Sequence, residues 1–179
     1  MSNHEEKPVT DAVHVLMAFK RTKDNDGPAK CLRTVIRDYE IDLKLLEEKC
    51  RLLGGEWRIH KTVNARDTKK ARVWLLHRLI DDPEASGYID SLWRTALLQK
   101  ECIFGEKKFM LDVDTKDPAH LSELERLIMS SHGKVLENIA TTNGWHYITN
   151  AFDTRLVCEL PYVSLIRDGY IFIKKVKGE

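Results

Sequence analysis

The chain has 179 residues, of which 42% are hydrophobic, enough for a buried core and too many for a disordered or fibrous protein. Its 29 basic and 28 acidic residues nearly cancel, which excludes a histone-like polycation and requires any anion-binding site to be local. No apolar run approaches the roughly 20 residues that span a bilayer, and the first residues are too polar for a signal peptide, so we expect a cytoplasmic protein with no membrane partner.

The first part of the chain predicts a disordered tail over residues 1–12 and then an α/β lobe over 13–105. Alternating apolar residues indicate a strand over 13–19, with odd-numbered residues on one face and even-numbered residues on the other. Apolar positions at three- and four-residue spacing predict a helix over 32–53, which Gly54-Gly55 ends. Further expected elements are a strand over 56–63 and helices over about 67–80 and 86–99.

The second part, residues 106–179, has a different order of elements. We expect, in chain order, a strand over 108–114, a helix from Asp117-Pro118 to 132, strands over 135–140 and 145–149, a short helix from about 153, and strands over 162–166 and 170–174. Strand, helix, strand, strand, helix, strand is the order of a ferredoxin-like or RNA-recognition-type (RRM-like) sheet. The prediction is therefore a single two-lobed α+β domain over 13–179, with an antiparallel ferredoxin/RRM-like sheet in its C-terminal half.

Two acidic residues end the compact apolar strand over 108–114. Residues i and i+2 of a strand point to the same face, so the carboxylates of Asp112 and Asp114 are expected to project together, about 6.6 Å apart along the strand. Two such acids are costly to bury unpaired, and a hard divalent cation compensates them. In the alternative interpretation, both acids lie at the strand end and cap the turn that follows. We favour the metal site.

A second feature is the sequence Thr141-Thr142-Asn143-Gly144-Trp145-His146, in which Asn143-Gly144 predicts a tight hairpin turn. A glycine there would let the backbone approach a phosphate, and His146 would begin the outgoing strand. The turn therefore predicts a nucleotide-phosphate contact. Taken alone, a histidine on a hairpin is more often a packed or solvated residue.

Basic residues are concentrated between Arg58 and Arg78, where seven cations accompany one acid and give a local net charge of +6. Arg58 and His60 are expected to share one strand face. Together with Lys61 and the amides of the next helix start, they would hold a triphosphate or a nucleic-acid backbone. The alternative is a solvated helix face that acids just downstream balance, and the sequence leaves both interpretations open.

These features occur in the same order in a known superfamily. The Asp112-x-Asp114 strand, the Asn143-Gly144-x-His146 turn and a later acid near a C-terminal strand resemble the archaeo-eukaryotic primase superfamily, over roughly residues 109–174. The stretch is also similar to small phage-encoded proteins of unassigned role, which carry a DIDT strand, an NGYHII turn and a following PFD. Here the corresponding segments are Asn143-Gly144-Trp145-His146-Tyr147-Ile148 and Ala151-Phe152-Asp153.

The resemblance implies a metal-dependent nucleotidyltransferase of primase-polymerase type. Asp112 and Asp114 would bind two Mg²⁺ or Mn²⁺ ions together with a third acid, for which Asp168 is the first candidate and Glu159 the substitute. His146 would be a catalytic residue that contacts the nucleotide triphosphate. The further nucleotide- or phosphate-binding residues expected on this view are Arg58, His60, Lys61, Asn143, Gly144 and Arg155.

The expected partners are nucleotides or single-stranded nucleic acid, in the cytoplasm, and in the host cytoplasm if a phage encodes the chain. Two other functions stay open. The first is a non-catalytic nucleic-acid or protein-binding module on the same fold, with Trp145, Tyr147 and Phe109 available for base stacking. The second is a metal-dependent phosphohydrolase that uses water in place of a 3′-hydroxyl. A metal requirement distinguishes both enzymes from the binding module.

Overall fold

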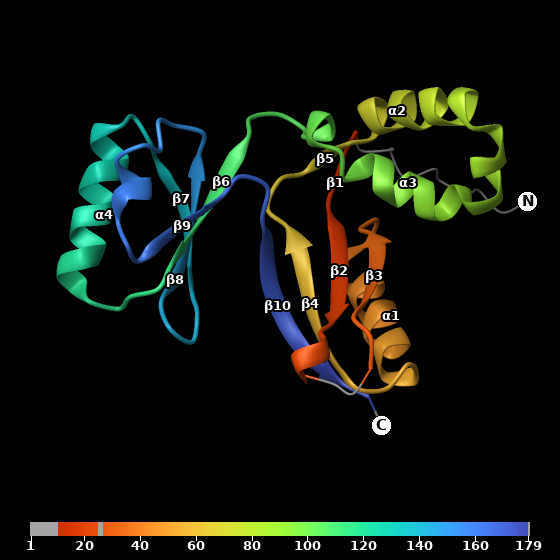
Figure 1. The fold of residues 1–179 in the computed structure, drawn as a ribbon, viewed down its shortest axis with the longest axis horizontal. Helices are drawn as coiled ribbons and strands as arrows, with labels where there is room; N and C mark the ends of the chain where they lie inside the picture. Colours follow the sequence, from red (N-terminus) through yellow and green to blue (C-terminus); the bar gives the residue numbers. More distant parts are fainter. Residues whose placement is uncertain (1–10, 25–26, 179) are drawn as a thin grey trace, which may run out of the picture.

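The computed structural model describes residues 11–24 and 27–178, and within them the chain forms a mixed α+β structure with two four-stranded antiparallel sheets (Figure 1). The predicted tail lies outside the described residues except at its end. Ala12 pairs with Asp67 in a short ladder between β1 (Ala12–Val13) and β5 (Arg66–Asp67), so the tail prediction is wrong for this residue. None of the described helices combines the length and hydropathy needed to cross a bilayer.

The N-terminal sheet has the strand order β10-β4-β2-β3. Its strands are β2 (Val15–Lys20), β3 (Lys30–Val35), β4 (Glu56–Thr62) and β10 (Tyr170–Lys177). The accompanying helices are α1 (Tyr39–Leu52), α2 (Thr68–Asp81) and α3 (Ile89–Leu97), with 3-10 turns η1 (Thr22–Asp24), η2 (Pro83–Tyr88) and η3 (Lys100–Cys102).

The side chains of β2 alternate between two faces as predicted, and the two faces are buried against different helices. Leu16 and Ala18 pack with Leu46 of α1, whereas Val15 and Met17 belong to the cluster that includes residues of α2 and α3. Both faces of this part of the sheet are therefore covered, which explains why residues 15–19 of β2 are all apolar.

The predicted helix over 32–53 is wrong in its first turns. Residues 30–35 form strand β3, which pairs with β2 along its whole length, and α1 begins at Tyr39. The carboxylate of Asp38 accepts a hydrogen bond from the amide of Ile41 and caps the helix. The run Thr34-Val35-Ile36 is β-branched and fits either period, so the apolar spacing alone did not reveal the strand.

The C-terminal sheet has the strand order β7-β8-β6-β9. Its strands are β6 (Lys108–Val113), β7 (Val135–Ala140), β8 (Trp145–Asn150) and β9 (Val163–Ile166), with helix α4 (Pro118–Ser130) and the 3-10 turn η4 (Val157–Glu159). Leu111 and Val113 of β6 pack against Leu124 and Ile128 of α4. One face of this sheet is thus buried under α4, and the even-numbered residues of β6 lie on the other face.

The last strand returns to the N-terminal sheet. β10 pairs with β4, from Tyr170 opposite Thr62 to Lys177 opposite Glu56. The predicted lobe boundary, which assigned all of 106–179 to one lobe, is therefore wrong for this strand. Figure 1 shows the chain passing from β9 in the C-terminal sheet to β10, the strand of the N-terminal sheet nearest to the C-terminal lobe. Because β10 belongs to the other sheet, the C-terminal segment ties the two lobes together.

Candidate functional site

Asp112 and His146 face each other across neighbouring strands. The register pairs Asp112 of β6 with His146 of β8, and the His146 Nε2 atom lies 3.4 Å from the Asp112 Oδ1 atom. The His146 side chain is 17% exposed and that of Asp112 is 37% exposed, so solvent reaches the carboxylate. Both lie on the face of the sheet opposite α4, where the next strand contributes Ser164 at the same level. The structure thus brings two of the three predicted catalytic residues together.

Asp114 lies immediately beyond the end of β6 and extends the hydrogen-bonded pairing of β6 with β9 by one residue. Its amide donates to the carbonyl oxygen of Tyr162 at 2.9 Å, and strand alternation then places its carboxylate on the face of Asp112. Other residues cap the turn that follows. Thr115 Oγ1 accepts a hydrogen bond from the amide of Asp117, and the Asp117 carboxylate accepts one from the amide of Ala119. In the described ranges, neither the Asp112 nor the Asp114 carboxylate accepts a hydrogen bond from a backbone amide.

The turn between β7 and β8 packs against the chain that follows these acids. Thr141 Oγ1 accepts a hydrogen bond from the amide of Gly144, and Lys116 Nζ donates to the carbonyl oxygen of Thr142 at 2.8 Å. A Cβ atom on Gly144 would overlap the carbonyl oxygen of Val113. The glycine is thus required by the close approach of two backbone segments, and Asn143 lies beside it on an exposed turn next to the acidic pair.

The basic residues of β4 are split between the two faces of the N-terminal sheet. Trp57 and Ile59 are buried against α1, so Arg58 and His60 share the opposite face, as predicted. Lys61 lies on the α1 face, where its ammonium group is 6.0 Å from the centre of the Tyr39 ring. Lys61 therefore lies on the opposite face of the sheet from Arg58 and His60, and the prediction that these three residues contact one phosphate group does not fit this geometry.

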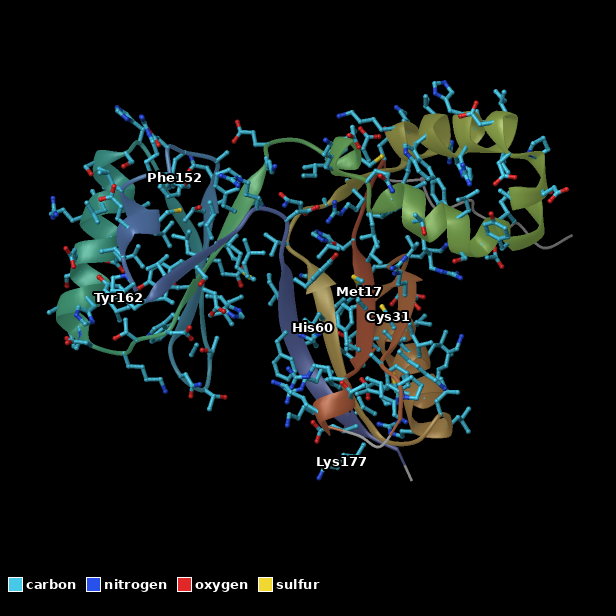
Figure 2. All side chains as sticks on the ribbon, in the orientation of Figure 1. Met17, Cys31, His60, Phe152, Tyr162 and Lys177 are labelled. Atoms are coloured by element: carbon cyan, nitrogen blue, oxygen red, sulfur yellow. The ribbon has the colours of Figure 1, made fainter. Side chains whose placement is uncertain are left out.

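His60 lies between two aromatic rings on this face. Its ring centre is 5.3 Å from that of Phe19 and 5.5 Å from that of Phe172, both in edge-to-face geometry. Figure 2 labels His60 on β4, within the N-terminal sheet. Burial lowers the pKa of His60 most strongly, and nearby charges, including that of His146, lower it further.

This aromatic group was missed by the sequence analysis. Phe172 is 42% exposed, and Tyr170 lies 6.1 Å from Phe19 between ring centres. By contrast, Phe109 and Tyr147 are buried and Trp145 packs in the α4 cluster, so these predicted stacking residues belong to the core. The signal for Phe172 was its two-residue alternation with Tyr170, which became informative only with the position of β10.

Asp168 does not join the other two acids. Its carboxylate accepts two hydrogen bonds from the guanidinium of Arg66, at 2.8 and 3.0 Å, and one from Asn64 Nδ2 at 3.1 Å. The register Met110–Ile166 places Asp168 near Lys108, at the end of β6 opposite Asp114 and about 13 Å along the strand from Asp112. Its predicted role as third metal ligand is therefore a misassignment, because it partners a buried cation.

Arg155 and Glu159 also lie elsewhere. Together with Ser130 and His132, they line a pocket at the C-terminal end of α4. The Arg155 guanidinium binds the Asp153 carboxylate with a shortest distance of 2.5 Å, and this pairing lowers the pKa of Asp153 to about 2. Since α4 covers the face of the sheet away from Asp112, neither the predicted phosphate contact of Arg155 nor Glu159 as substitute third acid fits this geometry.

The described residues contain no group of three or more histidine, cysteine, aspartate or glutamate side chains arranged to hold a metal ion. What the structure assembles is a pair of carboxylates with a histidine on one sheet, and an arginine, a histidine and aromatic rings on the other. Comparison with protein-family models, with curated proteins and with solved structures found no match. The function must therefore be argued from the chemistry of these residues.

The buried histidine makes stability depend on pH. Because the pKa of His60 is lowered in the folded state, the unfolded chain takes up a proton first as the pH falls below about 6.5, and protonation favours unfolding. We expect the urea midpoint to decrease from pH 7.5 to pH 5.5. His60→Phe, which keeps a ring between Phe19 and Phe172, should reduce that decrease. His77→Phe, at an exposed position on α2, is the control and should leave it unchanged.

Proposed function

We propose that this protein is a metal-dependent nucleotidyltransferase of the primase-polymerase type, acting on nucleotides or nucleic acid. The observation that carries the proposal is the Asp112–His146 pair, with Asp114 two residues on, on a sheet face that is not covered by α4. The chain order β6-α4-β7-β8-η4-β9 and the lateral order β7-β8-β6-β9 support a ferredoxin-like arrangement, with the second helix reduced to a 3-10 turn.

The two carboxylates are suited to bind one metal ion that keeps some of its water ligands, rather than to enclose an ion completely with protein ligands. Mg²⁺ keeps several waters and is commonly bound through one or two carboxylates plus substrate phosphates. Asp112 and Asp114 provide that number of carboxylates, and Asp168 is occupied by Arg66. We infer that the site gains affinity for Mg²⁺ or Mn²⁺ when a nucleotide triphosphate completes the ligand set. The bound ion would neutralise developing charge on the phosphates and promote attack by a 3′-hydroxyl.

The protein residues have separate roles in this proposal. Asp112 and Asp114 hold the ion, and His146 Nε2, now 3.4 Å from Asp112, donates a hydrogen bond to a phosphate oxygen. The proposal gives Arg58 and His60, on the other sheet, the role of adding positive and polar groups on the phosphate side. Phe172 offers an exposed ring on which a base can stack. Nucleotides or single-stranded nucleic acid are the substrates that this combination of groups favours.

Primer extension with labelled nucleotides tests the proposal. We expect incorporation that requires Mn²⁺ or Mg²⁺ and decreases by about a hundredfold or more in Asp112→Asn, since a ligand to the ion is lost. Glu159→Gln, on the α4 side of the sheet, is the matched control and should keep wild-type activity. Undiminished incorporation by folded Asp112→Asn would refute the proposal.

A nucleic-acid-binding module without catalysis is the second candidate, and the exposed Phe172 beside His60 favours it. That function predicts affinity for single strands that falls steeply with salt and does not change when EDTA removes divalent ions. The nucleotidyltransferase requires metal for turnover. Filter-binding titrations with and without EDTA, run beside the extension assay, therefore separate the two functions.

A further inference from the structure

A second pocket lies at the far edge of the N-terminal sheet. It has a volume of about 420 Å³ and is bounded by β3, α1 and α3. Figure 2 labels Cys31, one of its lining residues, on β3 at the side of the sheet away from the C-terminal lobe. Since β3 and β10 are the two outer strands, the width of the sheet, about 14 Å, separates this pocket from the C-terminal lobe.

The pocket concentrates positive charge from three elements. Arg33 comes from β3, Lys49 from α1 and Arg94 from α3, and no carboxylate lines the pocket. Thr34 and Ser91 add hydroxyl groups. Arg33 donates a long hydrogen bond to Thr95 Oγ1 at 3.4 Å. In the described part of the chain, Lys49 and Arg94 make neither an ion pair nor a side-chain hydrogen bond.

Several other cations of this protein have acidic partners. Arg51 binds Glu47 at 3.1 Å, Arg78 binds Asp82 at 2.8 Å, and Arg155 binds Asp153. Cations that line one pocket without a carboxylate repel each other, and a bound anion reduces that repulsion. The guanidinium groups of Arg33 and Arg94 can each donate two parallel hydrogen bonds to phosphate oxygens, and the hydroxyl groups supply further donors.

We propose that this pocket binds the phosphate groups of a small phosphorylated molecule, of the class of pyrophosphate or a nucleoside diphosphate. Its volume is within the usual range for small-ligand sites. Walls on β3, α1 and α3, with the buried Leu46 among the lining residues, favour a small ligand over a passing nucleic-acid strand. The site is independent of Asp112 and His146, so it stands whether or not the protein is a nucleotidyltransferase.

Cys31 provides a built-in reporter for this site. It is exposed and lines the pocket, Cys158 is exposed in η4 of the other lobe, and Cys50 and Cys102 are buried. We expect saturating pyrophosphate to slow alkylation of Cys31 by iodoacetamide at least about fivefold and to leave Cys158 unchanged. Isothermal titration of pyrophosphate into Asp112→Asn should still show this site, which separates it from the proposed catalytic site.

Charge variants test which residues bind the ligand. Arg94→Gln and Lys49→Gln should each raise the pyrophosphate concentration for half-protection about tenfold, the effect of losing one charge-assisted hydrogen bond. Lys44→Gln, an exposed position of α1 outside the pocket, should have no effect. Equal protection in all variants, or no heat of binding and no protection at Cys31, would overturn the proposal. Protection by an oligothymidylate but not by pyrophosphate or ADP would also overturn it, in favour of a nucleic-acid site.

Discussion

Asp168→Asn should lower the free energy of unfolding by about 3 kcal/mol, because it leaves the buried guanidinium of Arg66 without its counter-charge. The Arg66 side chain is 0% exposed and that of Asp168 is 29% exposed. Breaking a buried ion pair by removing one partner costs about 3–5 kcal/mol, and the partial exposure of Asp168 places this pair at the lower end. Urea unfolding in EDTA, at pH 7.5, measures the change.

The location of this pair explains why its loss should affect the whole molecule. Arg66 lies in β5, shortly after β4, and Asp168 lies in the turn between β9 and β10. The ion pair therefore links the segment that follows β4 of the N-terminal sheet to the segment that follows β9 of the C-terminal sheet. Asn64 donates to Asp168 and accepts from the amide of Lys108, at the start of β6, at 2.7 Å. Nearby, Val63 packs with Met110 and Ile148. Three of the polar residues at this junction are thus committed to holding the lobes together.

Two further variants keep the test decisive. Asp153→Asn removes the exposed partner of Arg155 and should cause no measurable change in stability. Arg66→Met combined with Asp168→Leu should recover part of the loss, because it removes both buried charges. If Asp168 were a metal ligand, Asp168→Asn would weaken metal binding and leave stability in EDTA unchanged. That outcome would refute the assignment made from the structure.

Local patterns predicted most of the secondary structure. The two-residue alternation of β2 and the Asp117-Pro118 start of α4 identified both elements, and similar local patterns indicated the strands over 135–140 and 145–149. These signals depend on a few neighbouring residues. The strand over 30–35 was missed because its stability comes from pairing with β2, a partner ten or more residues away that no local pattern identifies.

The sequence likewise predicted those parts of the candidate site that local patterns determine. Asp112 and Asp114 could be placed on one face because strand alternation is a local rule. His146 joined them only through the family resemblance, since β8 pairs with β6 across the intervening α4 and β7. The partners of Asp168 could not, since Arg66 lies 102 positions away in the sequence. Once β10 pairs with β4, the turn that carries Asp168 is drawn to the junction between the sheets. Asp168, which the family resemblance assigned as the third metal-binding acid, thus forms a structural ion pair with Arg66 in this chain.

Gly144→Ala should be the most damaging single methyl addition near the site. The new Cβ would overlap the carbonyl oxygen of Val113 and crowd the amide of Thr115, which lies 2.9 Å from the ideal Cβ position. Both obstacles are backbone atoms of the chain at the end of β6, so no side-chain rotation relieves the overlap. We expect a loss of about 3 kcal/mol in the free energy of unfolding, the upper end of overpacking costs.

Gly87→Ala is the matched control. Among the described residues, neither Gly144 nor Gly87 has a positive φ, so an added methyl group meets no conformational strain at either. A Cβ on Gly87 has open space, and this variant should change stability by less than about 1 kcal/mol, in the stabilising direction. The difference in stability between the two variants therefore reports the cost of the backbone overlap where the turn approaches the end of β6.

The same variant tests how the turn positions the site. His146 lies two residues after Gly144, and the shift needed to accommodate a methyl group moves the start of β8 away from β6. We expect the imidazole signals of His146 in NMR spectra to change in Gly144→Ala and to stay unchanged in Gly87→Ala. Wild-type stability and His146 signals in Gly144→Ala would contradict the packing described for this turn. A glycine that the family resemblance assigned to phosphate binding is, on this view, first a requirement for bringing His146 to Asp112.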